Sequence, residues 1–94
     1  MRDVELVLAN PSGLHARPAT LFTEAAARFG SKITVENLTR GKGPVDAKSV
    51  LMVLTAGVSS GHRIRLVAEG ADEAEAIDAL VELIDAGLGE PPGV

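Results

Sequence analysis

The sequence contains no cysteine, no tryptophan and no tyrosine, and only two phenylalanines among its 94 residues. The absence of cysteine excludes disulfide bonds, thiolate nucleophiles and cysteine-ligated metal sites. Phe22 and Phe29 are too few to form the aromatic stacking platforms of single-stranded nucleic-acid binders. The first twenty residues also lack an uninterrupted apolar run, so neither a signal peptide nor a membrane-spanning segment fits. We therefore expect a soluble protein of the cytoplasm.

The charges do not suit a nucleic-acid binder either. Nine basic and 13 acidic residues give a formal net charge of -4, and the basic residues are scattered along the chain. The length suits a single domain, which leaves no room for a second catalytic domain. We expect this domain to span residues 1–88 and the proline-containing segment 89–94 to form a flexible C-terminal tail.

The pattern of apolar residues predicts four strands and three helices. Alternation favours strands over residues 4–9 and 62–69, and β-branched character favours a strand over 32–38 and a short one near Val45. Helical spacing covers residues 16–29 and 72–85, and a short helix over 47–54 has Asp46 as its expected N-cap. The order βαββαβα, with half-polar strands, predicts an α+β open-faced β-sandwich in which three helices cover one face of a four-stranded antiparallel sheet.

The most informative segment runs from Pro11 to Ala19, because it places His15 at the expected start of a helix. A helix start offers unpaired backbone N–H groups and a partial positive charge, which together attract an anion. A neutral imidazole is a nucleophile, and a phosphoryl group on His15 would meet these donors and the Arg17 guanidinium. Taken alone, His15 is equally consistent with a simple helix cap, and Arg17 with a solvated surface charge.

Other chemistries fit this segment poorly. His62 is the only other histidine, and no acidic residue lies at metal-ligand spacing beside His15, so no metal site is predicted. The chain has no nucleophile elbow and is too small to surround a hydrolase substrate. The expected short helix is more apolar than one buried stripe requires, which leaves some of its side chains available at the surface.

The segment Gly13-Leu14-His15-Ala16-Arg17-Pro18-Ala19 resembles the active-site signature of the HPr family, the histidine phosphocarriers of the bacterial sugar phosphotransferase system. The resemblance extends to about the end of the last helix. The stretch from Ala47 to Leu51 resembles the regulatory-serine segment of the family, and Ala68-Glu69-Gly70 resembles the strand end before its C-terminal helix.

The resemblance implies that enzyme I, which draws on phosphoenolpyruvate, phosphorylates Nδ1 of His15, and that the group then passes to a IIA domain of a sugar transporter. Arg17 would contact the phosphoryl group, and Ser12 and Ala16 would lie around the same pocket. No cofactor would be required. The chain would thus be a phosphotransfer protein with a phosphohistidine intermediate rather than a free-standing enzyme.

The resemblance also implies a docking patch for both partners and a regulatory site. The patch would contain Thr20, Leu51, Met52 and Leu54, whereas burial in the core is the alternative for each of these side chains. Ser49 would be the target of an ATP-dependent HPr kinase, against a plain role as a helix cap. We expect a monomer, because a carrier must present one small face to successive partners.

Three alternatives remain open at this point. The chain could serve a nitrogen-related or dihydroxyacetone-kinase phosphotransfer chain, or could be one domain cut from a longer multiphosphoryl protein. It could also be a regulatory interaction module in which His15 plays no chemical part. The sequence does not identify the sugar or the transport system.

Overall fold

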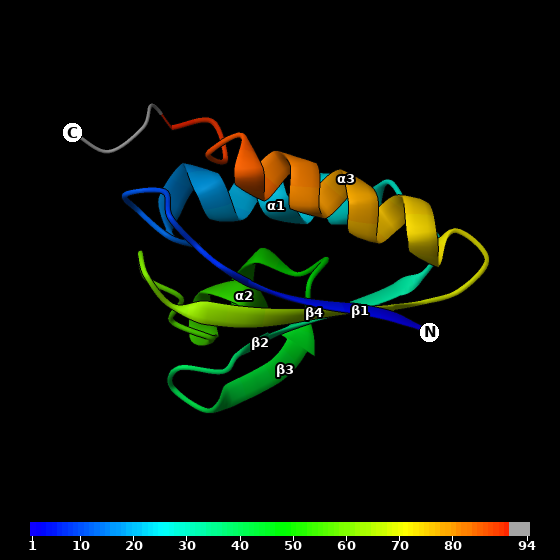
Figure 1. Cartoon of the computed structure of the whole chain (residues 1–94), viewed down its shortest axis with the longest axis horizontal. Helices are drawn as coiled ribbons and strands as arrows, with labels where there is room; N and C mark the ends of the chain where they lie inside the picture. Colours follow the sequence, from blue (N-terminus) through cyan, green and yellow to red (C-terminus); the bar gives the residue numbers. More distant parts are fainter. Residues whose placement is uncertain (91–94) are drawn as a thin grey trace.

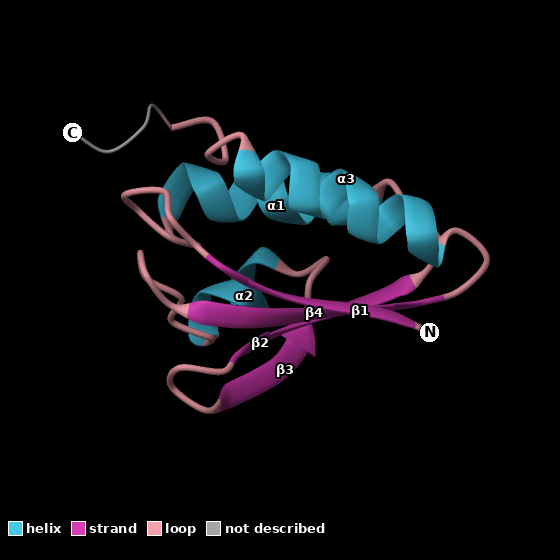
Figure 2. Cartoon of the chain, in the orientation of Figure 1, coloured by secondary structure: helices cyan, strands magenta, loops and turns pink. Residues whose placement is uncertain are grey.

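The computed structural model describes residues 1–90. Three helices and four strands are present in the expected order (Figure 2). Their bounds are β1 Arg2–Val7, α1 Ala16–Ala27, β2 Lys32–Asn37, β3 Lys42–Asp46, α2 Val50–Thr55, β4 Arg63–Glu69 and α3 Glu73–Asp85. The predicted fold class is confirmed: an open antiparallel sheet combined with three helices.

The sheet has the strand order β1-β4-β2-β3, and each neighbouring pair is antiparallel. The last strand in the sequence therefore lies between the first and the second. Helices α1 and α3 pack against each other, and both lie above the strands in Figure 1. The short helix α2 contacts α1 and β3. This arrangement buries one face of the sheet and leaves the other open.

Alternation along the strands explains which side chains form the core. In β4, Ile64, Leu66 and Ala68 are fully buried, whereas Arg63 is exposed and Arg65 is only partly covered. The side chains of a strand point alternately to opposite faces, so this pattern places one apolar face under the helices. The helices supply the facing layer of the core, in which Phe22, Ala26, Leu80 and Ile84 are buried.

The start of α2 differs from the sequence-based expectation. The helix begins at Val50, and its N-cap is Ser49, whose hydroxyl accepts a hydrogen bond from the Met52 N–H. Asp46 is not the N-cap, because it is the last residue of β3 and pairs with Thr34 of β2. Its carboxylate instead accepts from the Lys48 N–H at 2.9 Å, within the turn that joins strand and helix.

The ends of β1 and α1 also differ from the expected bounds. Strand β1 begins two residues early and ends two residues early, because Arg2 and Asp3 pair with Ala68 and Val67 of β4. Helix α1 ends at Ala27, and Arg28 is its C-cap. These shifts leave the order of the elements unchanged.

The segment after α3 folds back onto the domain. The backbone N–H groups of Gly87 and Leu88 donate to the carbonyls of Ile84 and Leu83, which is the Schellman arrangement that ends a helix. Gly87 has a positive φ of 92°, as this motif requires, and Leu88 becomes fully buried. Of the predicted tail, Gly89 and Glu90 belong to the described part of the chain, and residues 91–94 lie outside the described residues.

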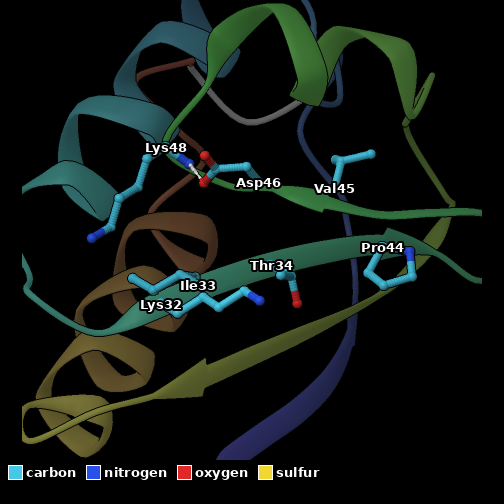
Figure 3. A pocket seen from close by; sticks show the side chains of 7 residues that line it. All are labelled: Lys32, Ile33, Thr34, Pro44, Val45, Asp46 and Lys48. Atoms are coloured by element: carbon cyan, nitrogen blue, oxygen red, sulfur yellow. Dashed lines mark hydrogen bonds between the residues drawn. The ribbon is translucent and has the colours of Figure 1, made fainter.

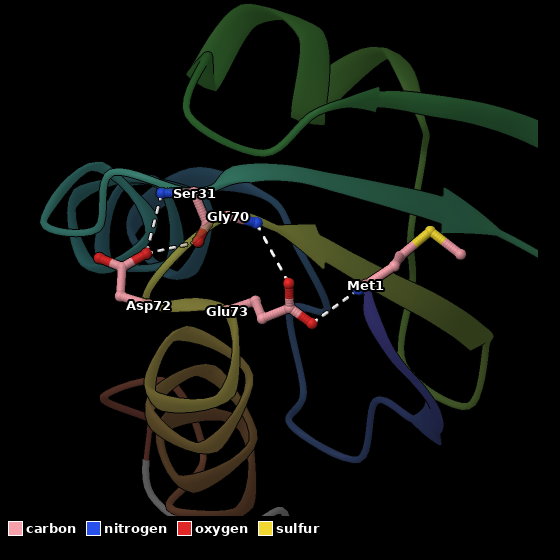
Figure 4. Close-up of polar contacts among 5 residues, drawn as sticks. All are labelled: Met1, Ser31, Gly70, Asp72 and Glu73. Atoms are coloured by element: carbon pink, nitrogen blue, oxygen red, sulfur yellow. Dashed lines mark hydrogen bonds and ion pairs between the residues drawn. The ribbon is translucent and has the colours of Figure 1, made fainter.

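A carboxylate cluster ties the start of α3 to the rest of the domain (Figure 4). The Asp72 carboxylate accepts hydrogen bonds from the backbone N–H groups of Gly30 and Ser31, both at 2.9 Å, and from the Ser31 hydroxyl. Glu73 accepts from the Gly70 N–H and contacts the Met1 ammonium group at 2.8 Å. The Asp72 contacts join the α1–β2 turn to the start of α3, and the Glu73 ion pair joins the N-terminus to it.

Acid should weaken the Asp72 contact. The hydrogen bond from the Ser31 hydroxyl, together with the Gly30 and Ser31 N–H groups, lowers the pKa of Asp72 below its usual value. A lowered folded-state pKa stabilises the fold above the pKa of the unfolded chain, and this contribution is lost as the pH falls through the folded-state pKa. We expect the stability advantage of the wild type over Asp72→Asn to be constant at neutral pH and to shrink below about pH 4.

Urea unfolding followed by far-ultraviolet circular dichroism measures this difference, since the chain has no tryptophan or tyrosine to report by fluorescence. Asp78→Asn is the matched control, because Asp78 is an exposed carboxylate on the same helix. Its stability difference from the wild type should not follow the Asp72 profile. An Asp72→Asn difference that stays constant down to pH 2 would contradict the explanation.

Candidate functional site

His15 is the N-cap of α1, with an extended backbone (φ -123°, ψ 159°), and it is half-buried. Its side chain makes no capping hydrogen bond, so the simple cap function considered from the sequence is not what the ring does. Within residues 1–90, the backbone N–H groups of His15, Ala16 and Arg17 have no hydrogen-bond acceptor. The ring therefore stands beside the unpaired donors of a helix start, where an anion is favoured.

The backbone is strained next to this histidine. Ala16 has a positive φ of 51°, in the left-handed region, although it carries a Cβ atom. This conformation costs a residue other than glycine about 1 to 2 kcal/mol. Such strain is concentrated at functional sites in proteins, and here it falls on the residue between His15 and Arg17.

Arg17 lies in the first turn of α1 and is exposed. None of the ion pairs among the described residues includes it. Pro18 follows as a buried third residue of the helix, where its missing N–H costs nothing because the first four N–H groups of a helix lack intrahelical partners. The guanidinium is thus available to an anion bound near His15.

The loop before His15 is fixed to the loop after α2. Gly13 has a positive φ of 59°, and a Cβ atom built on it would lie 2.3 Å from the Val58 carbonyl oxygen and 2.7 Å from the Ser59 Cα atom. The next residue, Leu14, donates its backbone N–H to the same Val58 oxygen at 2.9 Å, and its side chain is fully buried. Only glycine fits at position 13, and this close approach brings the His15 loop next to the C-terminal end of α2.

Ser12 is predicted to bind phosphate, yet its donors already have a partner. Its backbone N–H and its hydroxyl donate to the two carboxylate oxygens of Glu90, at 2.9 and 2.7 Å. The Asn10 side-chain amide donates to Glu90 at 2.9 Å and to the Gly13 carbonyl, also at 2.9 Å. The C-terminal segment is therefore bonded to the loop that carries His15. In Figure 1 the red segment and the blue loop lie at the same end of the molecule.

Helix α2 presents most of its apolar side chains to solvent. Val53 is its only buried residue, whereas Leu51 is 70% exposed and Met52 and Leu54 are each 41% exposed. These three side chains are therefore not core residues, which was the alternative considered for them. Thr20, on α1, is exposed as well, and α1 contacts α2.

Ser49 is half-buried, and its hydroxyl oxygen is 3.3 Å from the Met52 N–H that it caps. The structure thus gives Ser49 the cap function that was the alternative to regulation. A hydroxyl in this position precedes the exposed side chains of α2 directly.

A separate groove of about 510 Å³ lies between β2 and β3 (Figure 3). It is lined by Lys32, Thr34, Pro44, Asp46 and Lys48 among others. The Lys48 ammonium donates to the Phe29 carbonyl at 2.6 Å, so part of its hydrogen-bonding capacity is used within the fold. The groove contains neither His15 nor any residue of its loop, and we do not assign the chemistry to it.

Sequence reasoning missed Asn10 and Glu90 as parts of this site. Asn10 lies just before the Pro11–Ala19 segment that the sequence singles out, and Glu90 lies in the expected tail. Glu90 and Ser12 are 78 residues apart in the sequence, so no local spacing could associate them. The available signal was weak: a single carboxylate shortly after the glycine that ends α3.

Comparisons with known proteins identify the family. Residues 3–86 match the family described as PTS HPr component phosphorylation site. The chain is 47% identical over 83 residues to a multiphosphoryl transfer protein of Haemophilus influenzae, and 44% identical over 88 residues to one of Escherichia coli O157:H7. These matches cover 88% and 94% of this chain but only 17% and 23% of the relatives, so the chain spans about a fifth of their length.

A solved structure supports the same assignment. HPr-C-His from Thermoanaerobacter tengcongensis is 46% identical, superposes with a TM-score of 0.90, and the match covers 97% of this chain and 99% of that one. In the described part of the chain, no helix has the length and apolar character needed to cross a membrane. The match of fold and sequence over nearly the whole chain, with a histidine at the start of α1, shows that this chain belongs to the HPr family of the phosphotransferase system.

Proposed function

We propose that this chain is a phosphocarrier that accepts a phosphoryl group on His15 and hands it to a second protein. The observation that carries this proposal is the half-buried His15 side chain, which makes no capping bond and precedes helix N–H groups without acceptors in the described structure. A capping or core histidine would have its ring engaged. The family match supports the same chemistry.

The transfer requires a neutral imidazole. Nδ1 of His15 attacks phosphorus through its lone pair, a P–N bond forms, and the bond from phosphorus to the donor group breaks with its electron pair remaining on the donor. The Nε2 proton stays on the ring. We assign the new negative charge to Arg17, to the Ser12 donors and to the N–H groups at the start of α1, with Ala16 forming part of the surrounding backbone. Onward transfer reverses these steps, and neither a metal nor a cofactor takes part.

We further propose enzyme I as the donor, a IIA domain of a sugar transporter as the acceptor, and the cytoplasm as the site of exchange. Exposed apolar side chains on α2, close to the loop of His15, suit a surface that meets successive partners. We assign this docking surface to Thr20, Leu51, Met52 and Leu54. A monomer would leave it free.

We also propose that Ser49 is a site of regulatory phosphorylation. A phosphate on the hydroxyl would replace the group that accepts from Met52 N–H, and would place charge beside the apolar side chains that we assign to docking. Partners that bind by apolar contact would then be repelled. An ATP-dependent HPr kinase is the enzyme class that would add it.

Incubation with enzyme I and labelled phosphoenolpyruvate tests the proposed function. We expect about one acid-labile phosphate per chain, located on His15 Nδ1 by histidine-selective NMR, and its loss when a IIA domain is added. If enzyme I leaves the chain unlabelled while it labels an authentic HPr in a parallel reaction, the chain is not a carrier of this system. An interaction module that binds through α2 would then be the better description.

A further inference from the structure

The C-terminal segment contributes a carboxylate to the loop that precedes the phosphoacceptor. Helix α3 is ended by Gly87, Leu88 is fully buried, and the Glu90 N–H donates to the Gly87 carbonyl at 3.0 Å. This anchoring places the Glu90 side chain over the Asn10–Gly13 turn rather than in solvent. The geometry is therefore set by the fold of the C-terminal segment.

Three donors of the loop bind this carboxylate. One oxygen accepts from the Asn10 side-chain amide and the Ser12 N–H, and the other accepts from the Ser12 hydroxyl, with all three distances between 2.7 and 2.9 Å. Asn10 is only 5% exposed, and the same amide donates to the Gly13 carbonyl. The carboxylate thus completes a hydrogen-bonded turn whose last residues lead directly to His15.

No cation balances this charge among residues 1–90, because none of their ion pairs includes Glu90. Hydrogen bonds from Asn10 and Ser12 lower the pKa of Glu90, so the side chain is ionised at neutral pH. The Glu90 carboxylate is bound only by amide and hydroxyl donors. Phosphoryl oxygens need donors of the same kind. Two anions cannot share the donors of Ser12 without repulsion.

We propose that Glu90 occupies the Ser12 donors in the unphosphorylated chain and gives them up when His15 is phosphorylated. The contact between Glu90 and Ser12 then opposes the phosphorylation of His15. Glu90 is therefore a positioning residue, which weakens binding of the phosphoryl group at the site and favours its onward transfer. By linkage, phosphorylation of His15 weakens the Glu90–Ser12 contact by the same free energy by which that contact disfavours phosphorylation. The inference rests on the proposed acceptance of phosphate by His15.

The first test measures the phosphorylation equilibrium. The full chain, Glu90→Gln and Glu75→Gln are equilibrated with enzyme I at a fixed ratio of phosphoenolpyruvate to pyruvate. Glu75→Gln is the matched control, since Glu75 is an exposed carboxylate near the start of α3. We expect the ratio of phosphorylated to free Glu90→Gln to exceed that of the wild type about fivefold, at the low end of measured couplings, and Glu75→Gln to match the wild type.

A ratio for Glu90→Gln equal to or below that of the wild type would overturn the proposal. A lower ratio would mean that the carboxylate merely preorganises the loop. Urea unfolding of the three proteins measures their stability alongside the assay. A general loosening of the site would not raise the ratio of phosphorylated to free protein, so the expected increase distinguishes the proposal from a loss of stability.

The second test does not depend on enzyme I. Phosphoramidate phosphorylates histidine chemically: its P–N bond breaks, ammonia leaves with a proton from solvent, and a new P–N bond forms to the imidazole. Nuclear Overhauser contacts between the Glu90 side chain and the Ser12 amide proton should be strong in the free wild type and lost after phosphorylation of His15, at neutral pH where phosphohistidine survives. His15→Ala treated in the same way should keep them.

Contacts of unchanged strength after complete phosphorylation of His15 would overturn the displacement of Glu90. If the contacts are lost with phosphoramidate but enzyme I labels neither the wild type nor Glu90→Gln, the inference about Glu90 stands and the proposed partner is wrong. The two proposals therefore fail in different experiments.

Discussion

The His15→Ala variant should accept no phosphoryl group from phosphorylated enzyme I, so that its acid-labile label falls from about one phosphate per chain to background. The side chain is the only group at the start of α1 with a nucleophilic nitrogen. The fold should survive, because His15 makes no capping hydrogen bond and is only half-buried. Scintillation counting after gel filtration measures the label, and circular dichroism checks the fold.

His62→Asn is the matched control for this experiment. His62 is the other histidine, and its Nδ1 accepts from the Ser59 N–H at 3.1 Å, an interaction that an asparagine oxygen can imitate. This variant should be labelled as fully as the wild type. Label retained in His15→Ala but lost in His62→Asn would move the phosphoacceptor to the loop before β4.

Gly13→Ala should both destabilise the fold and slow phosphorylation, whereas Gly57→Ala should do only the first, and more weakly. Both glycines have a φ of 59°, and an alanine in that region costs about 1 to 2 kcal/mol. At Gly57 nothing lies within 4 Å of the added Cβ, whereas at Gly13 the Cβ would lie 2.3 Å from a backbone oxygen. The backbone must move, and overpacking of this kind adds about 1 to 3 kcal/mol.

The total of about 2 to 5 kcal/mol for Gly13→Ala is a large part of the 5 to 15 kcal/mol that stabilises a typical domain. The movement also breaks the bond from Leu14 N–H to Val58 that positions the residue before His15. Urea unfolding and the initial rate of labelling by enzyme I measure the two effects. Equal losses of stability in the two variants would contradict the close approach at Gly13.

The site was predictable where its residues are neighbours in the sequence. His15 and Arg17 lie two positions apart, between a turn containing glycine and a helix, and this local order alone predicts an anion at a helix start. The alternation of Ile64, Leu66 and Ala68 likewise predicted the buried face of β4, because every second side chain of a strand points to the same face of the sheet.

The start of α2 shows why the remaining features were not predictable. Asp46 and Ser49 are both good N-cap residues, and sequence preference alone does not choose between them. The choice is made by the sheet, because pairing with Thr34 keeps Asp46 in β3. The contact of Glu90 with Ser12 depends on the folded C-terminal segment in the same way, so it becomes visible only when distant parts of the chain are placed together.

The position of β4 between β1 and β2 has a consequence for how the chain acquires its structure. Arg2 of β1 pairs with Ala68 of β4, and Lys32 of β2 pairs with Glu69 of β4. Both β1 and β2 are therefore synthesised before the strand with which they pair. Until then, β1 has no partner in the sheet, and only the β2–β3 pair can form without it. Since distant pairings must close large loops first, assembly should be slow and occur late in synthesis, in a single cooperative step once β4 has emerged.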